Sequence, residues 1–333
     1  MTFKRKINRT ETYVFIALIL FITLVQIRSG QFFTGNNIVD IVRSLTIPAM
    51  FCIAELLILI SGGIDVSFPA IAALSMYIVS TRMINYQGSI GMFFLAGTVL
   101  GVAMGCLNGF LVAKFRFPAL IVTLGTASLY AGILNGVFGA HESPIPKQMH
   151  ALGKAKLFSV YNPRLQISSD MPVTVIFLVV LVVLTAILLY RTKLGRGIFA
   201  VGGDFVSAQR TGFNVIGIQM FVYAFSGALA GFTGVARAGM MLNCAPTNMT
   251  GMEMTVIAAC VLGGASVTGG SGTIIGTLLG ITLMTVMSNS LILIGIPTYW
   301  QRVFTGLIIL IGTGISAYQI LLKKKKLAEK KLN

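Results

Sequence analysis

The chain has 333 residues, of which 56% are hydrophobic and only 10% are charged, and its mean hydropathy is +0.89. A soluble domain carries about a quarter charged residues, so this composition excludes a soluble globular protein and indicates an integral membrane protein. The formal net charge of +16 gathers in short clusters beside apolar runs. Such clusters are typical of topology signals and of contact with anionic lipid headgroups, so we expect membrane lipid and no nucleic acid as a partner.

The predicted elements are membrane-spanning helices, each of which needs roughly 20 mainly apolar residues. The basic N-terminus is followed by an apolar run from Tyr13 without a small-residue cleavage site, so we expect the first span to be retained. The segments 46–61 and 252–265 are short or broken by glycine. We predict an all-α, polytopic membrane helical bundle that forms a single domain, 1–333, with about ten spans: 12–28, 46–61, 68–86, 90–113, 117–138, 172–190, 215–235, 252–265, 272–295 and 298–321.

The positions of lysine and arginine predict the orientation of these spans, because cytoplasmic connections are enriched in both. With the N-terminus in the cytoplasm, the basic connection 191–214 and the lysine-rich tail 322–333 also lie inside. Both termini are then cytoplasmic. The longest connection, 139–171, is extracytoplasmic.

Two predicted spans share one glycine spacing. GTVLGVAMG (97–105) and GTIIGTLLG (272–280) both read GTxxGxxxG, and small residues four apart allow close approach of helix backbones. The two spans run in opposite directions in the predicted topology. This indicates a possible inverted repeat of five plus five helices, as in many transporters. The alternative is that the motif is only the frequent packing signal of membrane helices.

Carboxylates within apolar segments are candidates for a polar translocation path, because such groups are costly in lipid. They are Glu55 in AELLILI, Asp65 in SGGIDVSFP and Glu253 in TGMEMTV. The alternative interpretation is that they are interfacial charges or interhelical pairs that hold the bundle together.

Two spans also carry uncharged polar side chains on one helix face, at spacings i, i+3 and i+7. These side chains suit a neutral, hydroxyl-rich solute, although ordinary hydrogen bonds between helices would need the same residues. Asn108 and Asn135 have the same two interpretations. The two sets are Thr123, Thr126 and Tyr130, and Thr282, Thr285 and Asn289.

The connection 191–214 contains the sequence VGGDFVSAQRTGFN. Asp204 is a good helix N-cap, and Gly212 stands where a C′ glycine would end the helix. We predict one short helix, which is too short to be stable alone in water. It therefore packs either on its own protein or on a partner.

Five blocks spread over about residues 50–315 resemble one known family. The blocks are SGGIDVSFPAIAALS, FPALIVTLGTASLYAGI, VGGDFVSAQRTGFNV, EMTVIAACVLGGASVTGGSGTIIGTLLG and GIPTYWQRVFTGLIILI. Together they resemble the permease subunits of bacterial ABC sugar importers, the ribose, xylose, galactose and autoinducer-2 group. The chain departs from the family pattern at Pro69, Thr255 and Asp204, where glycine, an acidic residue and asparagine are usual.

The resemblance implies a multi-pass protein of the bacterial cytoplasmic (inner) membrane that translocates a monosaccharide or similar solute. It implies a second permease subunit, two ABC ATPase domains and an extracytoplasmic sugar-binding protein as partners. The chain has no GxxxxGK[ST] phosphate loop, so we expect no enzyme activity and no cofactor of its own, with ATP used by the partner. The implied ATPase-coupling residues are Gly202, Gly203, Asp204, Ala208, Gln209, Arg210 and Gly212.

Two other functions are compatible with parts of the sequence. A self-contained proton-coupled transporter could use Glu55, Asp65 or Glu253. A membrane enzyme is a weaker alternative, because His141 and His150 lie in HESPIPKQMH without the HExxH spacing of a zinc site. The four cysteines also lack metal-binding spacing, so we expect no metal site.

Overall fold

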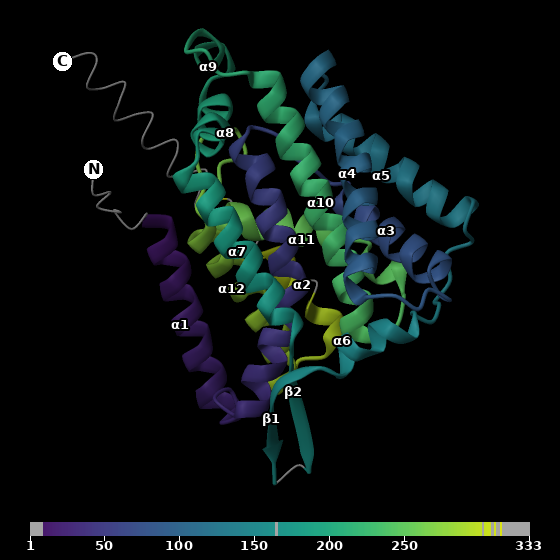
Figure 1. Cartoon of the computed structure of the whole chain (residues 1–333). Coiled ribbons are helices and arrows are strands. Elements are labelled where there is room, and N and C mark those ends of the chain that lie inside the picture. The colour runs from purple at the N-terminus through teal and green to yellow at the C-terminus, as the bar shows by residue number, and fades with distance from the viewer. Residues whose placement is uncertain (1–8, 164–165, 302, 308–309, 311–313, 315–333) are drawn as a thin grey trace, which may run out of the picture.

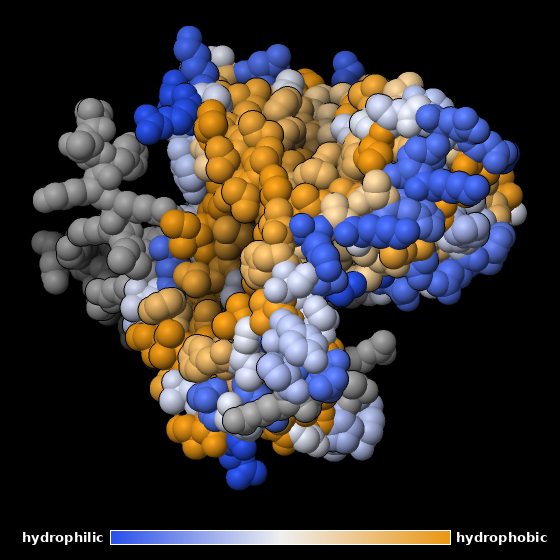
Figure 2. Space-filling model, turned by 60° about the horizontal axis from the view of Figure 1, so that its bottom comes forward, coloured by the Kyte–Doolittle hydropathy of each residue, from blue (hydrophilic) through white to orange (hydrophobic). Residues whose placement is uncertain are grey.

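The computed structural model describes residues 9–163, 166–301, 303–307, 310 and 314. Within these residues, seven helices are long and apolar enough to cross a membrane. Their exposed side chains include many large apolar groups, and Figure 2 shows a broad hydrophobic surface with hydrophilic residues in separate patches. The chain is therefore a helical membrane bundle. The seven helices are α1 (Arg9–Ser29), α2 (Gly35–Ile60), α4 (Ile90–Phe115), α5 (Ala119–Gly136), α7 (Thr174–Arg191), α10 (Val215–Met241) and α12 (Ile274–Leu293).

Three of the ten predicted spans do not correspond to membrane-spanning helices among the described residues. The segments 68–86 and 252–265 form the short helices α3 (Phe68–Arg82, 15 residues) and α11 (Met252–Leu262, 11 residues). Neither is long enough to span a membrane alone. Each follows a segment that is largely non-helical, 61–67 and 242–251. The last predicted span, 298–321, and the tail 322–333 lie mostly or wholly outside the described residues.

Helix α2 forms the centre of the bundle and is longer than predicted. It begins at Gly35, whereas the prediction began at residue 46. The difference arises because the first turns carry polar residues, which lower the hydropathy of this part of the helix. Every residue from Ala49 to Ile60 is buried. Pro48 lies inside the helix and removes one backbone hydrogen bond from it.

The connection 139–171 contains structure that the all-α prediction missed. After the short helix α6 (His150–Lys154), strands β1 (Lys156–Asn162) and β2 (Ile167–Pro172) pair as an antiparallel hairpin. The side-chain amide of Asn36 donates to the carbonyl of Val160 at 3.1 Å and to Ser169 Oγ at 3.1 Å. The hairpin is thus fastened to the first turn of α2.

The two ends of the bundle differ in structure (Figure 1). The hairpin extends from one end, while helices α8 (Lys193–Gly203) and α9 (Phe205–Arg210) lie at the other. Helix α2 runs the full distance, because it starts at the hairpin and ends beside α8. We call these the hairpin end and the α9 end.

Both GTxxGxxxG motifs lie where helix backbones touch. A Cβ atom on Gly101 of α4 would come within 2.0 Å of the carbonyl oxygen of Gly227 in α10. On α12, a Cβ on Gly280 would come within 2.1 Å of the carbonyl oxygen of Ala259 in α11. The motifs therefore act in close helix packing, and each contacts a different neighbouring helix.

Candidate functional site

The predicted short helix in the connection 191–214 is present, but a second helix precedes it. The hydroxyl of Thr192 accepts the Gly195 N–H at 3.0 Å and caps α8, which the sequence reading missed. Asp204 then caps α9 by accepting the Ser207 N–H at 2.5 Å. Helix α9 ends before Gly212, whose φ of +87° is the left-handed conformation expected at that position.

One side of α9 packs against the bundle, and the other side is exposed. Ala208 is buried against the bundle, whereas Gln209, Arg210 and Gly212 are exposed. The Ser207 backbone N–H, followed by the Ser207 hydroxyl, holds the pKa of the Asp204 carboxyl below its ordinary value. The cap is therefore ionised at neutral pH and is lost only as the pH falls through that lowered pKa. Helix α9 presents a pre-formed, exposed face at this end of the molecule.

Helix α8 packs on the bundle through the buried side chains of Ile198 and Val201, and through close backbone contacts at its glycines. A Cβ atom on Gly202 would lie 1.7 Å from the carbonyl oxygen of Ile60, the last residue of α2. The same carbonyl accepts the N–H of Gly270, at 2.8 Å, from the connection between α11 and α12. A Cβ on Gly269 would lie 2.5 Å from the carbonyl oxygen of Gly202. We call this meeting of α2, α8 and the α11–α12 connection the glycine junction.

A buried polar network begins directly beyond this junction, in the extended segment 61–67. The Asp65 N–H donates to Glu55 Oε1 at 3.3 Å. Asp65 Oδ1 accepts both the N–H and the hydroxyl of Ser67 at 2.6 Å. Both carboxylates are fully buried. The side chains of Asp65 and Ser67 are thus paired inside the bundle, where non-helical backbone is tolerated, whereas Glu55 Oε2 has no hydrogen-bond partner among the described residues.

Neighbouring helices hold the same segment in place. Asn108 of α4 donates from Nδ2 to Ser67 Oγ at 2.8 Å, and Thr123 of α5 donates to the carbonyl of Ile64 at 3.1 Å. Thr126 donates to the Thr123 carbonyl, and Tyr130 donates to the Met104 carbonyl of α4 at 2.9 Å. In the predicted stripe on α5, Thr123 and Tyr130 therefore form hydrogen bonds to other elements, whereas Thr126 bonds within its own helix.

Replacing Asp65 with leucine should destabilise the protein, because the Ser67 N–H and hydroxyl would be buried without an acceptor. We expect a cost of about 2 kcal/mol, which would lower the melting temperature of the detergent-purified protein by roughly 5 °C. Asp170→Leu is the control, since Asp170 lies on the exposed hairpin and pairs with Lys156 at the surface. Equal melting temperatures for the two variants would contradict a structural role for Asp65.

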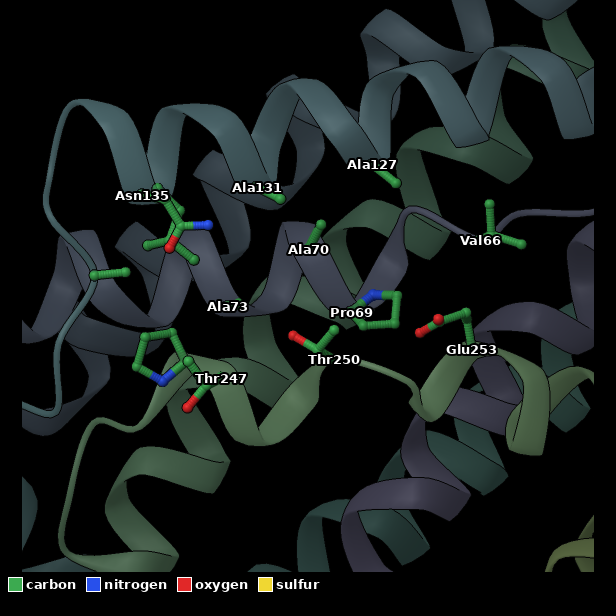
Figure 3. Close-up of a pocket in the computed structure, with 13 residues that line it drawn as sticks. Val66, Pro69, Ala70, Ala73, Ala127, Ala131, Asn135, Thr247, Thr250 and Glu253 are labelled. Atoms are coloured by element: carbon green, nitrogen blue, oxygen red, sulfur yellow. The ribbon is translucent and has the colours of Figure 1, made fainter. Parts of the chain in front are cut away.

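A first cavity, of about 170 Å³, lies between α3, α5 and the segment 246–253 (Figure 3). Ala70 and Ala73 of α3 face Ala127 and Ala131 of α5 across it. Thr247, Thr250 and Glu253 approach from the third side. We call it the α3–α5 cavity. Glu253 also accepts the Gly251 N–H at 3.1 Å, so this carboxylate both stabilises the start of α11 and faces the cavity.

A second cavity, of about 280 Å³, is open to the outside and is lined by α2, the start of α11 and α12. Thr285 and Asn289 line it, and Ser44, Thr250, Thr255 and Ser288 bring further uncharged polar groups. We call it the α2–α12 cavity. Thr250 lines both cavities, so the turn before α11 separates them.

The predicted path residues thus fall into separate places. Glu55, Asp65 and Thr123 meet at the segment 61–67, where Ser67 was missed although its spacing in Asp-Val-Ser is typical of an aspartate turn. Glu253 lines the α3–α5 cavity and Thr285 and Asn289 line the α2–α12 cavity. The segment 246–250, which contributes to both cavities, carried no clear signal.

Comparison of the sequence with known proteins finds membrane permeases. Residues 37–312 match the family described as branched-chain amino acid transport system / permease component. The ribose import permease protein RbsC of Escherichia coli K12 is 32% identical, over 89% of this chain and 90% of that protein. The L-arabinose ABC transporter permease protein AraH of Azospirillum brasilense is 31% identical, over 94% and 88%.

The autoinducer 2 import system permease protein LsrC of Yersinia enterocolitica is 29% identical, over 91% of this chain and 81% of that protein. No solved structure matches the chain. The family match and the sugar permeases at more than 30% identity each extend over most of the chain. The chain therefore belongs to the family of membrane permease components that also contains these ABC importer permeases.

Proposed function

We propose that this chain is the membrane-spanning permease subunit of an ABC importer in the bacterial inner membrane, carrying a monosaccharide or similar polyhydroxyl solute. The observation that carries the proposal is the similarity to permeases for ribose, arabinose and autoinducer 2 along about nine tenths of the chain. The chain itself is not an enzyme and holds no cofactor. ATP is bound and hydrolysed by two partner ATPase domains, and an extracytoplasmic binding protein delivers the solute.

The proposed ATPase contact is the exposed face of α9 with the residues around it. Asp204 and Gly212 fix the ends of α9, Ala208 packs inward, and Gln209 and Arg210 point outward. The glycine junction then connects this helix to α2 and to the segment 61–67. Movement of α9 on the ATPase would reach the buried network through Gly202 and Ile60, since these backbones are in direct contact.

The α9 end is cytoplasmic in this proposal, and the hairpin end, with both cavities nearer to it, faces outward. The two halves of the chain support the inverted repeat of five plus five helices. In each half a long helix (α2 or α10) is followed by a non-helical segment, a short helix (α3 or α11) and a GTxxGxxxG helix (α4 or α12). Helices α2 and α10 run in opposite directions (Figure 1). A second permease subunit completes the translocation path, in the membrane lipid.

The function is tested with the chain co-expressed with its ATPase and binding protein and reconstituted into vesicles. We expect uptake of a radiolabelled monosaccharide that requires enclosed ATP and the binding protein. A hydrolysis-deficient ATPase is the control. Uptake by the permease alone under a pH gradient, unaffected by ATP, would instead support proton coupling and would contradict the proposal.

Removing the α9 cap should weaken ATPase binding. Asp204→Ala deletes the acceptor for the Ser207 N–H, whereas Asp204→Asn retains an oxygen that caps comparably. We expect about a fivefold weaker association with the ATPase for Asp204→Ala and near-normal association for Asp204→Asn, measured by co-purification at graded ATPase concentration. If both variants bind like the unmodified chain, the capped helix is not the contact.

A further inference from the structure

The α2–α12 cavity has a composition that none of the comparisons assigns to a function. Six uncharged polar side chains line it, and among the described residues around it there is no charged one. None of the six hydroxyl or amide groups makes a hydrogen bond to another described residue. The six are Ser44, Thr250, Thr255, Thr285, Ser288 and Asn289.

Backbone groups add to this free hydrogen-bonding capacity. Proline has no N–H, so Pro48 leaves the carbonyl of Ser44 without its donor four residues on. Both residues line the cavity. Gly251 and Met252 also line it, where α11 starts; the Gly251 N–H already donates to Glu253, while the first turn of a helix has further N–H groups without intrahelical acceptors. Residues with unpaired backbone groups are therefore among those that line the cavity.

The lining also contains apolar side chains, those of Val256, Ile281 and Met284. A sugar ring has hydroxyl groups around its rim and C–H groups on its faces, so it needs both kinds of surface at once. A volume of about 280 Å³ is close to the lower limit for small-molecule sites, roughly 300 Å³, and suits one sugar ring.

From this arrangement we infer that the α2–α12 cavity is a transit site that binds one neutral monosaccharide, with Thr285, Ser288 and Asn289 as its main polar contacts. The inference rests on the proposed function and makes the solute class specific. A zwitterionic branched-chain amino acid would bring two charges into a cavity whose described lining offers no opposite charge, and burying unpaired charge is costly. A neutral polyol has no such cost.

The walls of this site belong to the helices that would move in the proposed conformational change. Its walls come from α2, which ends at the glycine junction, and from α12, which follows the connection containing Gly269 and Gly270. The side chain of Gln301 donates to the carbonyl of Ser288 at 2.8 Å, so the last described part of the chain also touches this wall. Displacement at the junction would therefore change the shape of the site.

The test uses the reconstituted importer with its ATPase and binding protein. The unmodified complex is first assayed for uptake of D-ribose, L-arabinose and L-leucine. The triple variant Thr285→Val, Ser288→Ala, Asn289→Leu then removes the polar atoms while nearly conserving volume. We expect a fall of at least about tenfold in the uptake rate of the carried sugar, with unchanged membrane yield and ATPase co-purification.

Thr282→Val is the matched control, because Thr282 lies on the same helix but outside the cavity, and it should transport normally. A second measurement places a thiol in the site: Ser288→Cys should react with a hydrophilic thiol reagent more slowly when the sugar is present. The inference would be overturned if the triple variant took up sugar normally, or if sugar did not slow the labelling of Ser288→Cys. Either result would leave the proposed function standing. Uptake of leucine and of neither sugar would overturn the proposed function as well.

Discussion

Gly202→Ala is expected to reduce ATP-driven uptake more than any other single methyl addition in the connection 191–214. The new Cβ atom would lie 1.7 Å from the carbonyl oxygen of Ile60 and 2.7 Å from the backbone nitrogen of Gly270. Backbone cannot yield as a flexible side chain does, so α8 must lift from the end of α2. We expect uptake to fall by at least about tenfold, because the glycine junction, which connects α9 through α8 to the segment 61–67, is broken.

The matched change is Gly203→Ala, which adds the same methyl group one residue later. No atom lies within 4 Å of the position of that Cβ, so its loss of uptake should be far smaller. Both variants are compared for membrane yield, melting temperature and ATPase co-purification, to separate coupling from misfolding. A Gly202→Ala importer as active as the unmodified one would show that the glycine junction does not transmit movement.

Gly101→Leu is expected to destabilise the bundle more than any other change considered. Four glycines of α4, Gly97, Gly101, Gly105 and Gly109, lie against α10, and at Gly101 even a Cβ would approach the Gly227 carbonyl oxygen to 2.0 Å. A leucine would force the two helices apart over their whole contact. We expect a cost of about 3 kcal/mol or more and a melting temperature lowered by roughly 10 °C, measured in detergent.

Gly132→Leu on α5 provides the comparison, because nothing lies within 4 Å of its Cβ position. It should insert and melt nearly as the unmodified protein does. If Gly101→Leu accumulated in membranes and melted at the same temperature as Gly132→Leu, close packing of α4 on α10 would not be what stabilises the bundle.

The sequence allowed the long apolar helices to be predicted, because burial in lipid demands a continuous apolar run. The helix boundaries were predicted wrongly where polar residues have a hydrogen-bond partner elsewhere in the fold. Asn36, at the start of α2, fell in the connection between the predicted spans 12–28 and 46–61, yet its amide binds the hairpin. Only one short helix was predicted in the connection 191–214. KLGRGIFAVGG forms a further helix, α8, and its Gly202 lies directly against the backbone of Ile60.

The candidate site was predictable only in part for a similar reason. The spacing of Thr285 and Asn289 placed both on one face of α12, and the structure finds them on one cavity wall. Helical spacing contains no information on which segment lies opposite. Ser44 and Thr250 reach the same space from distant parts of the chain, and Ser67 joins the buried network through a turn that follows Gly62 and Gly63. Only tertiary contacts bring these residues together.

The hairpin has a mechanical consequence for α2. Asn36 is bound to two separate acceptors on β1 and β2, so this end of the helix is anchored, whereas at the other end the carbonyl of Ile60 meets the backbones of Gly202 and Gly270. A rod that is fixed at one end and pushed at the other bends where it is weakest, and in α2 that point is Pro48, which lacks a backbone hydrogen bond. A push on the last turn of α2 is thereby converted into flexing near the middle of this helix.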